Sequence, residues 1–256
     1  GFHYSVLFLP PAQRRALTAL FACFQEIREI LYECADPTLA KIKLQWWRQE
    51  LAATFCATPH HPVTHALLPA IRQFDLPQHE LQKIIDGVEN GVTQNRIADF
   101  AALQNYCLAP YGSAEQLAAR ILGFDGVSSA KYAPELGLAF GLTDIILTVR
   151  DDARRNRILL PQDELARYGV AAADILNLRE TENFKKLIEF VIARAENCYN
   201  RATSDFPRVP KARRARLALA AINLARLQEI RKDGCRILRR RVDLTPLRKL
   251  WLAWLV

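Results

Sequence analysis

The feature that most constrains this chain is a long apolar stretch, Leu136 to Val149, in which Asp144 is the only charged residue. A helix that is apolar on most of its sides has to be surrounded by other elements, so this stretch predicts a central helix. Directly after it, the segment Arg150 to Arg155 carries five charges in six residues. The lone carboxylate inside the apolar stretch needs a cation or a hydrogen-bond donor as its partner.

The rest of the chain also shows helical periodicity. Apolar residues at positions 17, 20, 24, 27 and 31 form a stripe of period 3.6, and Asp36-Pro37 reads as an N-cap followed by a first-turn proline. No segment alternates convincingly with period two. We therefore predict a single all-α domain over residues 1–256, with the helix over 135–149 at its centre. Further helices are expected at 11–34, 37–55, 62–74, 77–97, 99–123 (with a break at Pro110 and Gly112 left open), 129–153, 182–204, 211–240 and 246–255.

Charge and cysteine content limit the classes of function. The formal net charge is +8, and residues 201–256 carry fifteen Lys and Arg against four Asp and Glu. Such a region suits phosphate-bearing partners, although a solvated helix face is the simpler explanation. No nucleic-acid-binding motif accompanies it, so we predict no nucleic-acid partner. Six cysteines without a CxxC pair suit a reducing cytosol, and Asp144 interrupts the longest apolar run. We therefore predict a cytoplasmic location without a signal peptide or transmembrane helix.

The polar face of the central helix carries candidate site residues. With about 100° of rotation per residue, Asp144, Thr148 and Asp151 lie within about 60° of one another, and Asp152 lies about 40° beyond Thr148. Apolar residues and glycines flank this face, so we expect it to look into a cavity rather than into bulk water. A carboxylate there is either a structural acid paired with an arginine or part of a ligand site, and the residues alone favour neither.

Several segments of the chain, in the right order, resemble one known family. The run LTDIILTVRDDARRNRILLP resembles the second aspartate-rich motif of the squalene/phytoene synthase family, roughly LTNILRDVxEDxxxGRxYLP. The segment HYSVLFLPPAQRRALTALFACFQEI resembles the family's start, KLQWWRQEL its KLxWWRxEI, and IIDGVENGVTQNR its DGMEMDLxxxR. The tail LTPLRKLWLAW is similar to that of presqualene diphosphate synthases. The resemblance implies an isoprenoid (terpenoid) synthase-type helical bundle around a central cavity.

The resemblance also implies a function. In the family, two aspartate motifs on facing helices hold Mg²⁺ ions, and these bind the diphosphates of two prenyl chains that are joined head to head in an apolar tunnel. The implied ligand is a prenyl diphosphate such as farnesyl diphosphate, with Mg²⁺ as cofactor if the chain is active. The resemblance implies substrate-binding roles for Ser5, Gln94, Asn95, Arg154 and Arg157.

The second motif departs from the family pattern at residues that carry the chemistry. Thr148 stands in place of the first metal aspartate, and Asp144 in place of an asparagine. Asp151 and Asp152 are the metal-ligand candidates that the motif retains. Outside this motif, Glu115 replaces a glycine of the family. The acidic wall of the expected cavity is therefore reduced.

The first motif departs further. Gln25, Arg28 and Tyr32 replace an arginine and two metal aspartates. Glu29 and Glu33 do not compensate, because the helical wheel places them opposite the apolar stripe and toward solvent. We therefore predict that Arg28 points into the cavity and pairs with Asp144 or Asp152, with an internal cation in place of Mg²⁺. The candidate catalytic positions are Gln25, Arg28, Tyr32, Asp144, Thr148 and Asp152.

Three functions remain open from the sequence. The first is a family member that binds prenyl diphosphates but has lost or weakened head-to-head condensation. The second is an active Mg²⁺-dependent presqualene- or phytoene-type synthase, and the third is a non-enzymatic assembly or interaction factor. In addition, the basic C-terminal region with its Leu- and Trp-rich tail predicts peripheral contact with a membrane, although a tail helix packed on the core explains the same residues.

Overall fold

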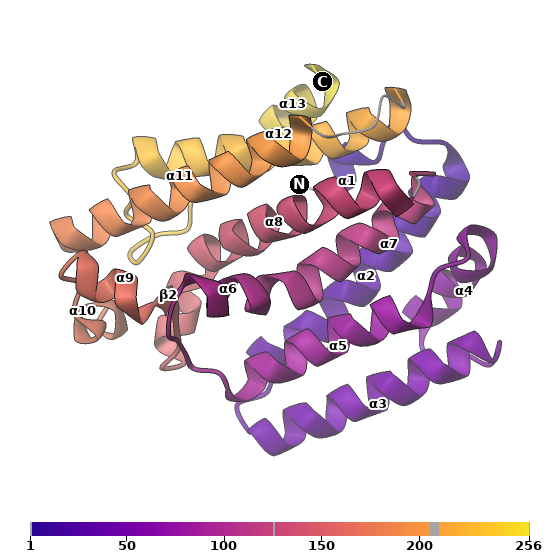
Figure 1. The fold of residues 1–256 in the computed structure, drawn as a ribbon, viewed down its shortest axis with the longest axis horizontal. Helices are drawn as coiled ribbons and strands as arrows, with labels where there is room; N and C mark the ends of the chain where they lie inside the picture. Colours follow the sequence, from indigo (N-terminus) through magenta and orange to yellow (C-terminus); the bar gives the residue numbers. More distant parts are fainter. Residues whose placement is uncertain (1, 125, 205–209, 256) are drawn as a thin grey trace.

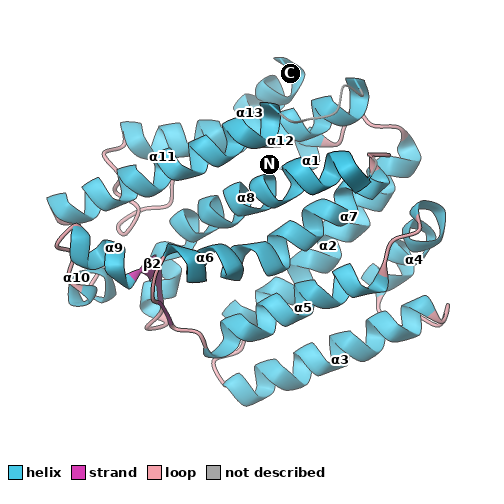
Figure 2. Ribbon diagram, viewed as in Figure 1, coloured by secondary structure: helices cyan, strands magenta, loops and turns pink. Residues whose placement is uncertain are grey.

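The computed structural model describes residues 2–124, 126–204 and 210–255, and this part of the chain is almost entirely helical (Figures 1 and 2). One continuous apolar core joins elements from Val6 to Leu238, which confirms a single all-α domain. The elements are α1 (Phe2–Ser5), α2 (Pro11–Glu33), α3 (Pro37–Phe55), α4 (Pro62–Phe74), α5 (Gln78–Thr93), β1 (Arg96–Ile97), α6 (Phe100–Cys107), η1 (Leu108–Gly112), α7 (Ser113–Ile121), α8 (Gly126–Arg154), β2 (Ile158–Pro161), α9 (Gln162–Arg167), α10 (Ala172–Leu176), α11 (Glu182–Ser204), α12 (Pro210–Lys232) and α13 (Pro246–Leu255).

Helix α8 lies at the centre of the bundle, as its apolar sequence predicts. It packs against α11 on one side and against α6, η1 and α7 on another, with α12 also in contact (Figure 1). Within the described residues, its segment Ser129–Arg154 has the length and hydropathy of a membrane span, but 67% of that window is buried inside the protein. We therefore assign α8 as the core helix of the bundle.

Two helices end earlier than their sequence patterns predict. The helix expected over 77–97 ends at Thr93, because the next residues extend and form β1, which pairs in parallel with β2. The backbone N–H of Ile158 donates to the carbonyl of Asn95 over 3.0 Å, and Ile97 and Ile158 are buried at this pair. The strands are too short for period-two alternation, so no pattern of residues predicts them.

The helix expected over 211–240 ends at Lys232. Gly234 and Cys235 adopt the left-handed conformation, with φ of 70° and 56°. The N–H of Cys235 then donates to the carbonyl of Ile230 over 2.9 Å, which closes the helix end. The segment after it runs as turns and extended chain to α13.

The segment at Pro110 and Gly112 is a π-helical turn rather than a break. Element η1 joins α6 and α7 without interrupting the helical path. Pro110 has no backbone N–H to donate and its ring needs space, and both conditions favour a wider turn. The space comes from Gly87 on α5, where a Cβ atom would lie only 2.5 Å from Cδ of Pro110.

Candidate functional site

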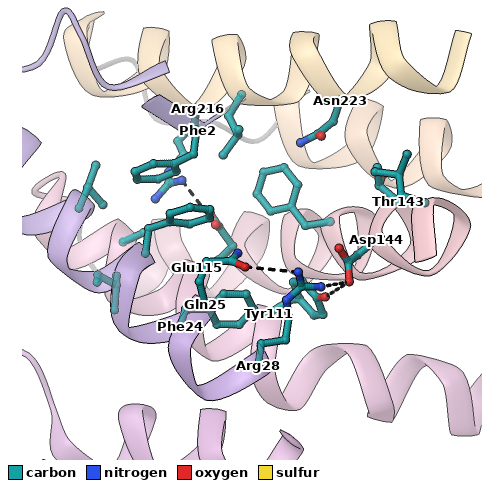
Figure 3. Close-up of a pocket in the computed structure, with 18 of the residues that line it drawn as sticks. Phe2, Phe24, Gln25, Arg28, Tyr111, Glu115, Thr143, Asp144, Arg216 and Asn223 are labelled. Carbon is teal, nitrogen blue, oxygen red and sulfur yellow. Dashed lines mark hydrogen bonds and ion pairs between the residues drawn. The ribbon is translucent and has the colours of Figure 1, made fainter. Parts of the chain in front are cut away.

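A cavity of about 200 Å³ lies between α2, η1, α7, α8 and α12 (Figure 3). Most of its wall is apolar. Phe21 lines the cavity and is 37% exposed, so the cavity reaches the surface beside α1. The apolar residues of the wall include Phe2, Phe21, Phe24, Phe140, Leu147 and Leu219.

One end of the cavity is closed by an ion pair between Arg28 of α2 and Asp144 of α8 (Figure 3). This contact confirms the predicted partner of Arg28. Nη2 of Arg28 also donates to Oε1 of Gln25 over 3.3 Å. Burial alone would lower the pKa of Arg28, but Tyr111 and Asp144 overcome that effect and raise it above its ordinary value. Arg28 is therefore a fixed cation at the end of the apolar cavity.

Asp144 has a second partner, Tyr111 of η1, whose hydroxyl donates to Oδ2 of the carboxylate over 2.7 Å. Two glycines of α8 allow η1 to come this close. A Cβ atom on Gly137 would lie 2.7 Å from the backbone of Gly112, and one on Gly141 would lie 2.7 Å from Sγ of Cys107. The glycines that flank the polar face of α8 therefore serve close helix packing, which aims Tyr111 at Asp144.

Beyond this ion pair, toward the C-terminal ends of α2 and α8, little space remains between the two helices. A void of about 20 Å³, lined by Tyr32, Thr148 and Tyr106 among others, has room for about one water molecule. The ring of Tyr32 lies between two guanidinium groups, 5.7 Å from Arg28 and 5.4 Å from Arg155. The space between Tyr32 of α2 and Thr148 of α8, where the sequence resemblance implies the metal ligands, is therefore filled largely by protein side chains.

Asp152 is buried under this filled region. Its Oδ2 accepts from Oγ1 of Thr148 over 2.9 Å, and its Oδ1 lies 3.7 Å from Nε of Arg157. Burial raises the pKa of Asp152 to about 6, although Arg157 and Thr148 act in the opposite direction. Nη2 of Arg157 also donates to the hydroxyl of Tyr106 over 3.1 Å, and burial raises the pKa of that tyrosine to about 12. Asp152 is thus a buried carboxylate whose nearest cation is Arg157.

The carboxylates near this end do not converge on a common point. Asp151 pairs outward with Arg241, Asp152 pairs with Arg157, and Asp144 pairs with Arg28. Among the described residues, no three His, Cys, Asp or Glu side chains come together in a group that could hold a metal ion. Mg²⁺ prefers several oxygen ligands that are free to coordinate, and each of these acids already has a guanidinium as its counter-charge. The donor set present does not fit the family's Mg²⁺.

The two arginines predicted to bind phosphate, Arg154 and Arg157, and the neighbouring Arg155 point to three different places. Arg154 is exposed, and Arg155 donates to the carbonyl of Tyr32 over 2.7 Å. Arg157 is buried against Asp152. The structure therefore does not bring these side chains together as one phosphate site.

The other predicted substrate-binding residues lie away from the cavity wall. Ser5 is buried, and its hydroxyl donates to the carbonyl of Phe2 over 2.7 Å. Gln94 is the C-terminal cap of α5, and Asn95 leads into β1, where its carbonyl accepts from Ile158. Their binding roles stay predictions.

Sequence reasoning missed a second polar contact inside the cavity. Nη1 of Arg216 on α12 lies 3.4 Å from Oε1 of Glu115 on α7, and both side chains are buried in the cavity wall (Figure 3). Burial raises the pKa of Glu115, and Arg216 opposes this shift. The one available signal was that Glu115 replaces a family glycine. Nothing in the sequence distinguished Arg216 from the other arginines of its basic region.

Solved structures share this arrangement of helices. A dehydrosqualene synthase in complex with ligand superposes with a TM-score of 0.89 at 21% identity, covering 99% of this chain and 89% of that one. The squalene synthase HpnC from Alicyclobacillus acidocaldarius superposes with a TM-score of 0.79 at 21% identity, covering 92% and 89%. At these identities the likeness shows the fold, which is that of squalene synthases.

Sequence comparison supplies the family. The family profile described as squalene/phytoene synthase matches residues 1–248, so the chain belongs to the squalene/phytoene synthase family. Phytoene synthase of Arthrospira platensis is 28% identical over 214 residues, which cover 78% of this chain and 69% of the relative. That of Mycobacterium bovis is 29% identical over 261 residues, covering 99% and 84%. The chain spans only about half of some plant relatives, such as 49% of phytoene synthase 3 of Zea mays.

Proposed function

We propose that this protein binds one prenyl diphosphate in its central cavity and that its Mg²⁺-dependent head-to-head condensation is lost or much weakened. The observation that carries the proposal is the ion pair between Arg28 and Asp144, which joins the two segments that resemble the family's aspartate motifs. An arginine in that position repels Mg²⁺, and it binds phosphate oxygens directly. A bound diphosphate would therefore share the Arg28 guanidinium with Asp144.

A donor atom of Arg28 that lacks a hydrogen-bond partner supports direct binding of a diphosphate. Nε of Arg28 is buried and has no hydrogen-bond partner among the described residues, and Arg28 borders the cavity. A buried N–H without an acceptor is costly, so a ligand oxygen that accepts from it gains affinity. The apolar wall that starts beside this atom, with Phe24, Phe140 and Leu147, suits a prenyl chain.

The size of the cavity supports one chain rather than two. Its volume is about 200 Å³, whereas pockets for larger organic ligands span roughly 300–1,000 Å³. A dry cavity of roughly 150 Å³ binds benzene, which is much smaller than a farnesyl chain. Head-to-head condensation needs two chains side by side, and the cavity is too small for that pair. A single chain needs less added space, and the cavity can open for it at its surface end, beside the half-exposed Phe21.

The test is calorimetric titration with farnesyl diphosphate, with and without Mg²⁺, followed by incubation with radiolabelled farnesyl diphosphate and extraction of hydrocarbon products. We expect binding that Mg²⁺ does not strengthen, with no released diphosphate and no condensed product. Farnesol and inorganic diphosphate serve as matched probes for the chain and the head group. Arg28→Gln is expected to weaken farnesyl diphosphate binding at least about tenfold and to leave farnesol binding unchanged.

The second candidate is an active Mg²⁺-dependent synthase that joins two prenyl diphosphates. The match to the family profile over residues 1–248 and the relatives named phytoene synthase favour it. Mg²⁺-dependent release of diphosphate together with a condensed hydrocarbon would establish this candidate and refute the proposal. Absence of farnesyl diphosphate binding under both conditions would instead favour a non-enzymatic interaction factor.

A further inference from the structure

We propose that the outer face of α13 docks the protein onto a lipid bilayer that contains anionic lipids. Five side chains of this helix, Leu247, Leu250, Trp251, Trp254 and Leu255, form what we term the α13 surface. The proposal rests on the exposure of these side chains, on the charge around them and on their position relative to the cavity. The exposure and charge that carry the proposal do not depend on the ligand of the central cavity, and only the argument from position rests on the proposed function.

The exposure is the first observation. Leu247, Trp251 and Trp254 are 79%, 57% and 64% exposed. They follow the i, i+4, i+7 spacing of one helix face, while Ala253 on the opposite face is fully buried against α12. A short helix with Leu and Trp on its solvent face has the composition of an interfacial helix, because indole rings prefer the boundary between lipid and water.

The charge around this face is the second observation, and it selects the partner. The acids beside α13 are already shared between cations: Asp243 pairs with both Arg226 and Lys249, and Glu229 with both Lys232 and Arg248. Arg214, which donates to the carbonyl of Trp254, adds a fifth cation to these four, so five cations meet two acids around α13. Anionic lipid head groups complement such a surface, because basic residues near a membrane are attracted to its negative surface potential. A second copy of the same basic surface would be repelled.

The position of α13 is the third observation. Helix α1 packs against both α12 and α13, and Phe2 of α1 lines the cavity. The ring of Phe8, which is also exposed, lies 4.7 Å from the guanidinium of Arg214, and Arg214 in turn donates to the carbonyl of Trp254 over 2.7 Å. The apolar mouth of the cavity therefore lies close to the α13 surface. A bilayer bound there would face the entry of a lipid-soluble chain.

The chain offers a matched control surface. Helix α3 also exposes Leu39, Ile42 and Trp46, and it lies at the edge of the bundle opposite α13 (Figure 1). Changing Ile42 and Trp46, which are 62% and 43% exposed, removes exposed apolar area from another side of the molecule. If surface hydrophobicity in general causes vesicle binding, the changes on α3 and those on α13 should both weaken it. If the protein docks through α13, only the changes on α13 should weaken it.

The experiment is co-sedimentation of the full chain with vesicles of phosphatidylcholine alone or of phosphatidylcholine mixed with phosphatidylglycerol, at low salt and at about 0.5 M salt. We expect the partition coefficient to be at least about tenfold higher on the anionic vesicles and to fall at least about tenfold in high salt. On the anionic vesicles at low salt, Trp251→Ser with Trp254→Ser should lower the partition coefficient at least about tenfold. Ile42→Ser with Trp46→Ser should leave the partition coefficient unchanged.

Three results would overturn the proposal. The first is equal sedimentation of the native chain with both vesicle types, and the second is full vesicle binding by the Trp251→Ser, Trp254→Ser variant. The third is a native chain that is a dimer in analytical ultracentrifugation while this variant is a monomer. Circular dichroism melting of each variant checks that it is folded. If the serine variant is unfolded, tryptophan fluorescence of the native chain and of Trp251→Phe with Trp254→Phe supplies the test. Anionic vesicles should shift the tryptophan emission of the native chain to the blue. The phenylalanine variant keeps the apolar face but lacks these two indoles, so its emission should not shift.

Discussion

The hydroxyl of Tyr111 donates to Oδ2 of Asp144 over 2.7 Å, and that same oxygen pairs with Arg28. A single carboxylate oxygen thus ties α2, η1 and α8 together at the end of the cavity. Burial raises the pKa of Tyr111 well above its ordinary value, and the negative charge of Asp144 adds to this shift, so the phenol stays protonated and remains a donor.

The Arg28–Asp144 pair predicts a specific pattern of stability. Arg28→Leu leaves Asp144 without its cation and should lower the free energy of unfolding by on the order of 3–5 kcal/mol. Adding Asp144→Asn removes the stranded charge and should recover a large part of that loss. Urea unfolding of both single variants and the double variant measures the coupling. Additive effects of the two substitutions would show that the side chains do not depend on each other.

Restoring acids at the replaced positions should restore a response to Mg²⁺. We expect the combination of Arg28→Asp, Tyr32→Asp and Thr148→Asp to place three carboxylates beside Asp144 and Asp152, and so to destabilise the protein in the absence of metal. Millimolar Mg²⁺ should then raise the melting temperature of the variant but not that of the native chain, because an ion that binds only the folded state stabilises it. Na⁺ at equal ionic strength is the control. A folded variant with no Mg²⁺-specific shift would mean that the backbone no longer supports the family's metal site.

The buried pair of Glu115 and Arg216 should behave as a coupled unit. Arg216→Leu leaves a carboxylate enclosed in the cavity wall, and we expect a loss on the order of 3–5 kcal/mol in the free energy of unfolding. Glu115→Leu combined with Arg216→Leu replaces both charges by apolar side chains and should be close to neutral. Urea unfolding of the two single variants and of the double variant provides the measurement. A double variant that is as unstable as the sum of the single ones would refute the coupling.

Glu50 on α3 gives a prediction for pH. Burial alone would raise its pKa, but hydrogen bonds from Thr64 and from the backbone N–H groups of His61 and His60 lower it from 4.5 to about 2. Because the folded-state pKa lies below the unfolded one, this stabilisation is complete above about pH 4.5 and is lost as the pH falls toward 2. Glu50→Gln should therefore cost on the order of 2 kcal/mol at pH 7 and much less near pH 2.5, measured by urea unfolding. A cost that does not change with pH would contradict this assignment.

The sequence predicted the parts of the site that regular helices position. Arg28 lies beside the apolar stripe of α2, and Asp144 is the lone charge of residues 136–149, so helical wheels turned both side chains inward. The family resemblance then brought the two helices face to face and left Asp144 or Asp152 as the partner of Arg28. The wheel of α2 also correctly placed Glu29 and Glu33 in solvent, where both are exposed. These positions follow from helix geometry because α2 and α8 run without a change of register between the residues concerned.

Parts that depend on irregular backbone or on distant partners could not be predicted. The π turn of η1 adds a residue to the helical register, so a wheel drawn from α6 does not place Tyr111. Arg216 is one of fifteen basic residues in residues 201–256, and only the fold, which brings it 3.4 Å from Glu115 of α7, shows that it is buried. The β1–β2 pair is too short to leave a pattern in the sequence.

The composition of α8 has a consequence for the chain before it folds. A segment from Ser129 to Arg154 that is long and apolar enough to cross a bilayer would be a candidate for insertion during synthesis, when its partner helices are not yet in place. Asp144 lies near the middle of that segment, where an aspartate opposes insertion by roughly 3 kcal/mol. The carboxylate that later pairs with Arg28 thus also opposes insertion of the unfolded segment, and a neutral apolar residue at this position would remove the ion pair and this opposition together.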